Sequence, residues 1–142
     1  MVCVGLAIAL ARCGGDPQCA AACANELRVR FDKPILLGDT FSVSVAESSG
    51  HGRVEISCQS SAGSDGYACD QIVTDTIRVR FLSLTRELGG IIVSEPTPGE
   101  ELKYSVTVDG VLVREFSVRY DPVSVAGVCG VNCYGSTEIV VQ

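Results

Sequence analysis

Two runs of alternating apolar and polar residues meet at Asp109-Gly110, and this junction constrains the fold of the chain more than any other feature. Aspartate followed by glycine favours a type I′ turn, because both central residues of that turn have positive φ. The run from Lys103 to Val108 and the run from Val111 to Tyr120 are therefore predicted to form a β-hairpin. A chain organised around such a hairpin belongs to a β-rich fold.

The alternation in the second run changes phase, which predicts a β-bulge. A two-residue loop places Val108 opposite Val111, and in that register Phe116 would face solvent. One extra residue near Arg114-Glu115 would return Phe116 to the apolar face, because a bulge reverses the side-chain parity of a strand. With that bulge, the expected apolar face of the hairpin carries Tyr104, Val106, Val108, Val111, Val113, Phe116, Val118 and Tyr120.

Alternation of the same kind recurs along most of the chain. Arginines mark the predicted outer positions, at Arg28 and Arg30 in one run and at Arg78 and Arg80 in another. Turn-rich segments separate about eight such runs, which is typical of an antiparallel sandwich. We therefore expect a single all-β domain over residues 26–142, an antiparallel immunoglobulin-like β-sandwich of about eight strands. Its predicted core comprises Leu27, Val29, Phe31, Phe41, Val43, Val45, Val54, Ile56, Ile77, Val79, Phe81, Val106, Val108, Phe116 and Val118.

Two segments are expected to interrupt the strands. Residues 59–70 are rich in serine and glycine and predict a long loop or a loose hairpin. Residues 85–90 predict a turn-like break before a short strand at residues 91–93.

Composition and charge argue against some classes of partner. The chain has 142 residues, of which 46% are hydrophobic, so a single domain can bury a core without depending on cross-links. The formal net charge is -6. An acidic protein is poorly suited to nucleic acid or an anionic membrane surface, since both attract basic proteins.

The beginning of the chain has the features of a processed leader. Residues 2–11 form an apolar run that matches a signal peptide and is shorter than the ~20 residues that a membrane-spanning helix needs. Ala9-Leu10-Ala11 fits ordinary secretory cleavage, whereas Leu10-Ala11-Arg12-Cys13 resembles the lipobox of bacterial lipoproteins, in which the cysteine is lipidated. Lipidation at Cys13, plain secretion and an uncleaved segment remain open. We assign residues 1–13 to the leader and residues 14–25 to a tether.

The eight cysteines indicate an oxidising compartment, because cytosolic thiols are kept reduced. Removing Cys3 with the leader and acylating Cys13 leaves six of the eight. Their proximity favours local disulfides, although Cys19 or Cys23 could instead attach the tether to the sandwich. Zinc is the weaker alternative, because the spacings do not repeat a C-x2-C pattern. The expected local pairs are Cys19 with Cys23, Cys58 with Cys69, and Cys129 with Cys133.

Residues that could carry catalysis are few. His51 is the only histidine and lies between two glycines, where a loop tip would not hold a catalytic base. The alternative to a non-catalytic protein is a small secreted hydrolase or metal-dependent enzyme, assembled from His51, Asp65, Asp70 and Glu55.

Ligand-binding patterns are also sparse, and we expect no cofactor and no metal. Two acidic loops could offer oxygen atoms to calcium, but their spacing is not that of a calcium loop, so solvated loops are expected. Tyr67 and Tyr134 are the candidates for an aromatic carbohydrate platform, and the alternative is that each covers the disulfide beside it. The residues of the acidic loops are Asp65 and Asp70 in one, and Glu95, Glu100 and Glu101 in the other.

A hydrophobic leader ending in cysteine, followed by strands and the closing sequence CGVNCYGSTEIVV, resembles small bacterial envelope lipoproteins of uncharacterised function. The resemblance implies an immunoglobulin-like sandwich tethered to a membrane. We therefore expect a non-catalytic, exported binding or structural module of the cell envelope. Its partner would be an envelope protein or a surface polymer, bound through loops or an exposed strand edge.

Overall fold

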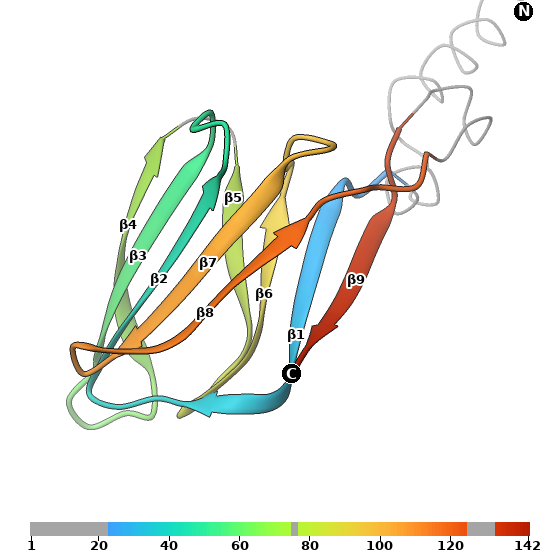
Figure 1. Ribbon diagram of the computed structural model, residues 1–142. Helices are drawn as coiled ribbons and strands as arrows, with labels where there is room; N and C mark the ends of the chain where they lie inside the picture. Colours follow the sequence, from blue (N-terminus) through green and yellow to red (C-terminus); the bar gives the residue numbers. More distant parts are fainter. Residues whose placement is uncertain (1–22, 75–76, 125–132) are drawn as a thin grey trace, which may run out of the picture.

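The computed structural model describes residues 23–74, 77–124 and 133–142, and in these ranges the chain is built from strands. Two twisted sheets face each other (Figure 1). The predicted all-β class and two-sheet arrangement are therefore confirmed, with nine strands in the described ranges against about eight expected. The strands are β1 (Glu26–Leu36), β2 (Thr40–Glu47), β3 (Arg53–Ser60), β4 (Tyr67–Thr74), β5 (Arg78–Leu84), β6 (Glu87–Ser94), β7 (Glu101–Val108), β8 (Val111–Arg119) and β9 (Ser136–Val141).

Segments predicted as breaks contribute to three of these strands. β3 continues to Ser60 and β4 starts at Tyr67, so the serine- and glycine-rich segment is a hairpin with its loop at residues 61–66. β6 begins at Glu87 and runs through Gly90, where a turn had been expected. A Cβ atom at Gly90 would lie 2.4 Å from the carbonyl oxygen of Val29. This glycine therefore permits close approach of β1 to β6, a tertiary role that local sequence does not reveal.

The order of strands is β5-β6-β1-β9 in the four-stranded sheet and β4-β3-β2-β7-β8 in the five-stranded sheet. All neighbouring strands are antiparallel except β1 and β9, which run parallel. The chain passes between the sheets after β8, and this crossover brings β9 alongside β1 in the same direction. The expectation of a purely antiparallel sandwich was therefore wrong for β9.

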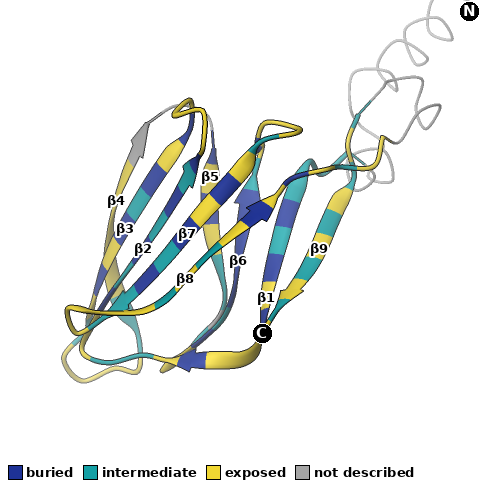
Figure 2. Ribbon diagram, in the orientation of Figure 1, coloured by how far each residue is buried: buried dark blue, intermediate teal, exposed yellow. Residues whose placement is uncertain are grey.

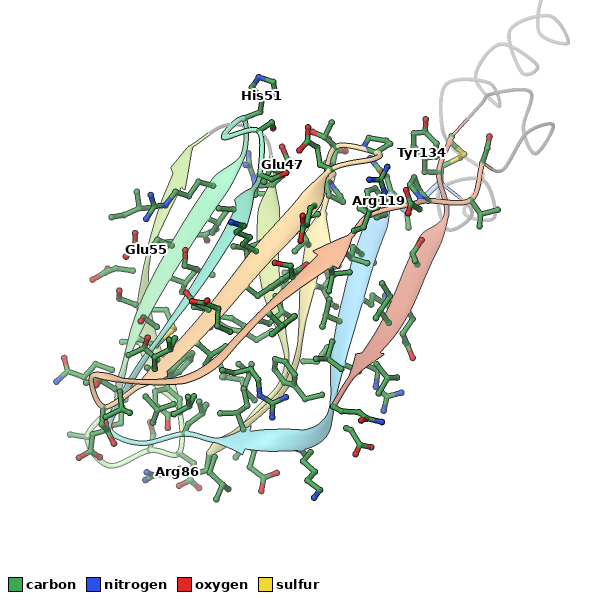
Figure 3. All side chains as sticks on the ribbon, viewed as in Figure 1. Glu47, His51, Glu55, Arg86, Arg119 and Tyr134 are labelled. Atoms are coloured by element: carbon green, nitrogen blue, oxygen red, sulfur yellow. A yellow bond between two sulfur atoms is a disulfide. The ribbon has the colours of Figure 1, made fainter. Side chains whose placement is uncertain are left out.

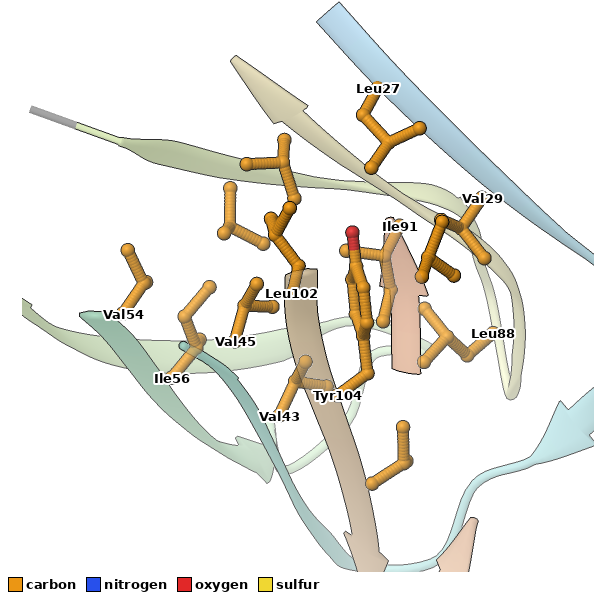
Figure 4. Close-up of a cluster of buried hydrophobic side chains, with 14 of the residues drawn as sticks. Leu27, Val29, Val43, Val45, Val54, Ile56, Leu88, Ile91, Leu102 and Tyr104 are labelled. Carbon is orange, nitrogen blue, oxygen red and sulfur yellow. The ribbon is translucent and has the colours of Figure 1, made fainter. Parts of the chain in front are cut away.

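The core lies between the two sheets, and buried and exposed residues alternate along β2 and β3 (Figure 2). All the predicted core residues are buried except Phe81, Val108 and Phe116, which are partly buried. The arginines predicted to face outward are not buried. In the middle of the core the ring of Tyr104 lies among aliphatic side chains, including Ile91 (Figure 4).

The central hairpin turns as predicted. Asp109 and Gly110 have φ angles of 48° and 79°, as a type I′ turn requires, and Val108 lies opposite Val111. The backbone N–H of Thr40 donates a 2.9 Å hydrogen bond to the Asp109 carboxylate. This bond attaches the turn to the start of β2.

The bulge in β8 lies closer to the turn than predicted. The ladder shifts between Val106 and Thr107, which leaves Val113 as the extra residue, directly before the expected position. The parity after the bulge is as expected, because Phe116 packs against the core. Val111 lies on the same face as Val108, as expected, but it is 64% exposed, and Val113, the extra residue, is 45% exposed, so neither belongs to the core. β8 is an edge strand, and its residues near the turn have β7 on one side only.

Candidate functional site

The disulfide between Cys58 and Cys69 joins β3 to β4, as the local pairing predicted. The two residues lie directly opposite each other, with Cα atoms 4.1 Å apart. Cys58 is buried in the core, whereas Cys69 is exposed on the edge strand of the five-stranded sheet.

The second disulfide joins Cys23 to Cys133, which are 110 positions apart in the sequence and have Cα atoms 5.3 Å apart. The predicted local pairs, Cys19 with Cys23 and Cys129 with Cys133, were therefore wrong. Cys23 instead attaches the tether to the sandwich, which was the alternative prediction. Cys13, Cys19 and Cys129 lie outside the described residues. Disulfides of this kind are typical of an oxidising compartment.

Hydrogen bonds of Asn25 help to hold the segments that carry Cys23 and Cys133 close together. Its backbone N–H donates to the carbonyl of Tyr134 at 2.9 Å, and its own carbonyl accepts from the N–H of Glu95 at 2.9 Å. Its side-chain oxygen accepts a 2.7 Å hydrogen bond from the hydroxyl of Tyr120. Burial, and then the nearby Tyr134, raise the pKa of Tyr120. These bonds hold the start of β1 beside the start of β9.

The residues proposed for an enzyme do not converge. His51 is exposed in the loop between β2 and β3, and Asp65 lies in the loop at the other end of β3, where it shares a small hollow with Arg86 (Figure 3). A strand of eight residues separates them, a length of about 25 Å. Glu55 forms an ion pair with Arg53 on the outer face of β3. His51, Asp65 and Glu55 therefore lie in separate environments, whereas Asp70 on β4 shares the outer face of the sheet with Glu55.

The acidic loop before β7 binds a neighbouring loop of the protein. The Glu100 carboxylate accepts hydrogen bonds from the Ser48 hydroxyl at 3.1 Å and the Ser49 N–H at 3.3 Å. Glu95 and Glu101 are exposed. Across the described ranges, no group of three or more His, Cys, Asp or Glu side chains could hold a metal ion.

Sequence reasoning missed Glu47, which is a buried carboxylate at the end of β2. It is 3% exposed, and it accepts hydrogen bonds from Thr97 in the loop before β7. The signal was present, because Glu47 continues the inward positions of Phe41, Val43 and Val45. Glu47 and Glu100 together attach the loop after β2 to the loop before β7.

The two tyrosines considered for an aromatic platform lie at opposite ends of the sandwich (Figures 1 and 3). Tyr67 is half-buried at the start of β4, where its ring packs edge-on against Phe41 and its hydroxyl donates to the carbonyl of Gly38 at 2.8 Å. Tyr134 is 37% exposed beside the Cys23–Cys133 disulfide. They do not form a common platform.

The outer face of the five-stranded sheet is hollowed in two places, of about 510 and 430 Å³. The larger hollow is lined by residues of β2, β3, β4 and β7, and the smaller by residues of β2, β7 and β8. Both can exchange hydrogen bonds, because many of their side chains carry hydroxyl, amide or charged groups. The larger hollow is lined by Thr40, Ser42, Ser57, Gln59, Asp70 and Thr107 together with Phe41, Cys58, Ala68, Cys69 and Gly110, and the smaller by Ser44, Ala46, Lys103, Ser105, Glu115 and Ser117 together with Tyr104 and Phe116.

The strands at the ends of the two sheets differ in how well they resist pairing with another chain. β5 presents outward arginines, β8 contains a bulge, and β9 carries Glu138, which pairs with Arg30 at 3.4 Å. β4 pairs with β3 along its whole length without a register shift, and it contains no lysine, arginine or proline. Charged side chains, bulges and proline are the usual protection of an edge, so β4 is the least protected of these edges.

Comparison of the chain with protein-family models, curated proteins and solved structures gives no match. The class of protein is therefore defined by the fold and the candidate site alone. It is a disulfide-bonded all-β sandwich whose five-stranded sheet has a hollowed outer face. None of the described residues forms a helix that is long and apolar enough to cross a membrane.

Proposed function

We propose that this protein is a non-catalytic, exported β-sandwich of the bacterial cell envelope that binds a hydroxyl-rich surface polymer. In this proposal the sandwich is of the immunoglobulin-like kind, and a lipid on Cys13 holds it at a membrane. The leader sequence and the two disulfides support export, because disulfides persist in oxidising compartments.

The observation that carries the proposal is the larger hollow on the outer face of the five-stranded sheet. Its volume of about 510 Å³ lies within the range of ordinary ligand sites. The hydroxyls of Ser42, Ser57 and Thr107 in its lining can both donate and accept hydrogen bonds, as the hydroxyls of a polysaccharide can. Asp70 and Gln59 in the same lining add carboxylate acceptors and an amide donor.

The position of this hollow fits a tethered protein. Asn25 and the Cys23–Cys133 disulfide lie at the end of the sandwich where β1 begins, whereas Gly110 and the turn between β7 and β8 border the hollow at the other end (Figure 1). A chain attached through residues 14–25 would present the hollow away from its point of attachment.

Binding of purified envelope polysaccharide by calorimetry tests the function. Ser57→Arg would fill the hollow with a long side chain and should weaken binding at least about tenfold, the effect of losing one or two hydrogen bonds. Val140→Arg is the control, because Val140 is 59% exposed on β9 in the other sheet. Equal binding by the two variants, or no binding by the wild type, contradicts the proposal.

Mass spectrometry of the mature N-terminus tests export and anchoring. A diacylated or triacylated Cys13 at the N-terminus is the expected result. An intact Met1 on a protein recovered from the cytosol contradicts export, whereas a mature protein that starts directly after Ala11 supports export without the anchor.

A further inference from the structure

The outer edge of β4 is an unused set of backbone hydrogen-bonding groups. Residues Tyr67–Thr74 each pair with a residue of β3, from Tyr67 opposite Ser60 to Thr74 opposite Arg53. In the described part of the chain, β4 has no strand on its other side. Alternate N–H and C=O groups of β4 therefore point outward from the sheet, available to another strand.

The side chains of this edge favour pairing over repulsion. The only charged residue in β4 is Asp70, and the ladder to β3 is regular. Ile72 lies on the outer face opposite Glu55 and is 67% exposed, a large aliphatic side chain on an edge that lacks cationic protection.

We propose that β4 pairs with β4 of a second copy of this chain, antiparallel and about a two-fold axis, so that the five-stranded sheets of both copies become continuous. A symmetric antiparallel pairing places the central residue opposite its own counterpart, on the same face of the sheet. The choice of central residue therefore decides whether the edge is self-complementary.

Of the two outer-face residues in the middle of β4, Ile72 suits self-pairing better than Asp70. Centring on Asp70 would set two carboxylates opposite each other, which is unfavourable. Centring on Ile72 sets two exposed aliphatic side chains opposite each other and covers both from water. The two Asp70 carboxylates are then about 13 Å apart along the strands, beyond the screening length of ~10 Å in about 0.1 M salt.

Dimerisation through β4 does not depend on polymer binding, although dimerisation would strengthen the binding of a long polymer. Asp70 lines the larger hollow, so pairing through β4 places the hollows of both copies on one continuous sheet surface. A long polymer could then contact both hollows, which would raise its overall affinity.

Cross-linking of the purified full chain tests the register. Ile72→Cys should form an intermolecular disulfide under mild oxidation, because opposed residues in a sheet have Cβ atoms about 4.5–5.5 Å apart. Asp70→Cys should not cross-link, because its counterpart lies too far away in this register. Val140→Cys is the matched control, since Val140 is similarly exposed on the β9 edge. Cross-linking through Val140, or through Asp70 in preference to Ile72, overturns the proposal.

Sedimentation equilibrium of the full chain tests the association itself. The wild type should dimerise reversibly with concentration, and Ile72→Lys should weaken the dimer at least about tenfold, because two like charges would face each other across the axis. Val140→Lys should leave the dimer unchanged. Circular dichroism confirms that each variant is folded, as expected for substitutions at exposed positions. A wild type that is monomeric at millimolar concentration, or a dimer unaffected by Ile72→Lys, contradicts the inference.

Discussion

The carboxylate of Glu47 accepts two hydrogen bonds from Thr97, one from the backbone N–H at 2.7 Å and one from the hydroxyl at 3.1 Å. Glu47 is the last residue of β2 and Thr97 lies in the loop before β7, and the carboxylate is almost fully buried. A buried carboxylate requires such partners, because an unpaired charge in a core is strongly unfavourable.

Replacing Glu47 should therefore destabilise the fold. Glu47→Ala removes the acceptor of the Thr97 N–H and hydroxyl hydrogen bonds, and the free energy of unfolding should fall by about 2 kcal/mol. Urea denaturation followed by circular dichroism measures this change. Glu87→Ala, at an exposed position of β6, is the control and should change the stability by less than about 0.5 kcal/mol.

Two buried tyrosines should respond in opposite directions to loss of the hydroxyl group. The hydroxyl of Tyr104 is buried and has no hydrogen-bond partner among the described residues, whereas that of Tyr120 donates to Asn25. Tyr104→Phe should leave the stability unchanged or raise it by about 1 kcal/mol, and Tyr120→Phe should lower it by about 1 kcal/mol. Chemical denaturation of both variants provides the comparison, and a large loss of stability in Tyr104→Phe would contradict it.

The protein should lose stability at alkaline pH. Burial raises the pKa of Tyr104 above its usual value of about 10, which the unfolded chain retains. Below about pH 10 both states are protonated and the full stability is present. Above it the unfolded state ionises first, so stability falls as the pH rises. Between about pH 9 and 11 the unfolding free energies of the wild type and Tyr104→Phe should diverge, because the free energy should fall less steeply with pH in the variant. Equal slopes of unfolding free energy against pH would refute the assignment to Tyr104.

The two disulfides should contribute unequally to stability. Loop entropy predicts that a bond closing a 110-residue separation contributes about 2 kcal/mol more than one closing an 11-residue separation. The double variant Cys23→Ser with Cys133→Ser should therefore unfold at lower denaturant than Cys58→Ser with Cys69→Ser. The same denaturation experiment compares the two, and the reverse order would show that local packing around β4 outweighs loop length.

Much of the fold was predictable because strand residues alternate between two faces. The period of two along Leu27, Val29 and Phe31 is a local property, and it identifies the buried face whatever the neighbouring strand is. The turn at Asp109-Gly110 was predictable for a similar reason, since its backbone conformation depends on the residues themselves. Proximity likewise sufficed for Cys58 and Cys69, because a short hairpin joins them.

The candidate site was less predictable, because a hollow depends on which strands become neighbours. The outer positions of Ser42, Ser57 and Thr107 follow from the alternation along their strands, but nothing local shows that β2 lies between β3 and β7. The same holds for Ile72, whose exposure on an edge follows from the order of strands in the sheet.

The sequence by itself determined which side of β1, β2, β3, β5 and β7 turns inward, where the central hairpin reverses and which cysteines lie close along the chain. The tertiary structure alone decided that Cys133 bonds Cys23, that β9 runs parallel to β1, and that β4 stands at the end of its sheet among the described strands. The physical reason is that alternation and turn conformation arise from interactions between near neighbours in the chain. The pairing of β1 with β9 and the long disulfide arise from contacts between segments about a hundred residues apart, and their energies depend on how the two sheets pack as a whole.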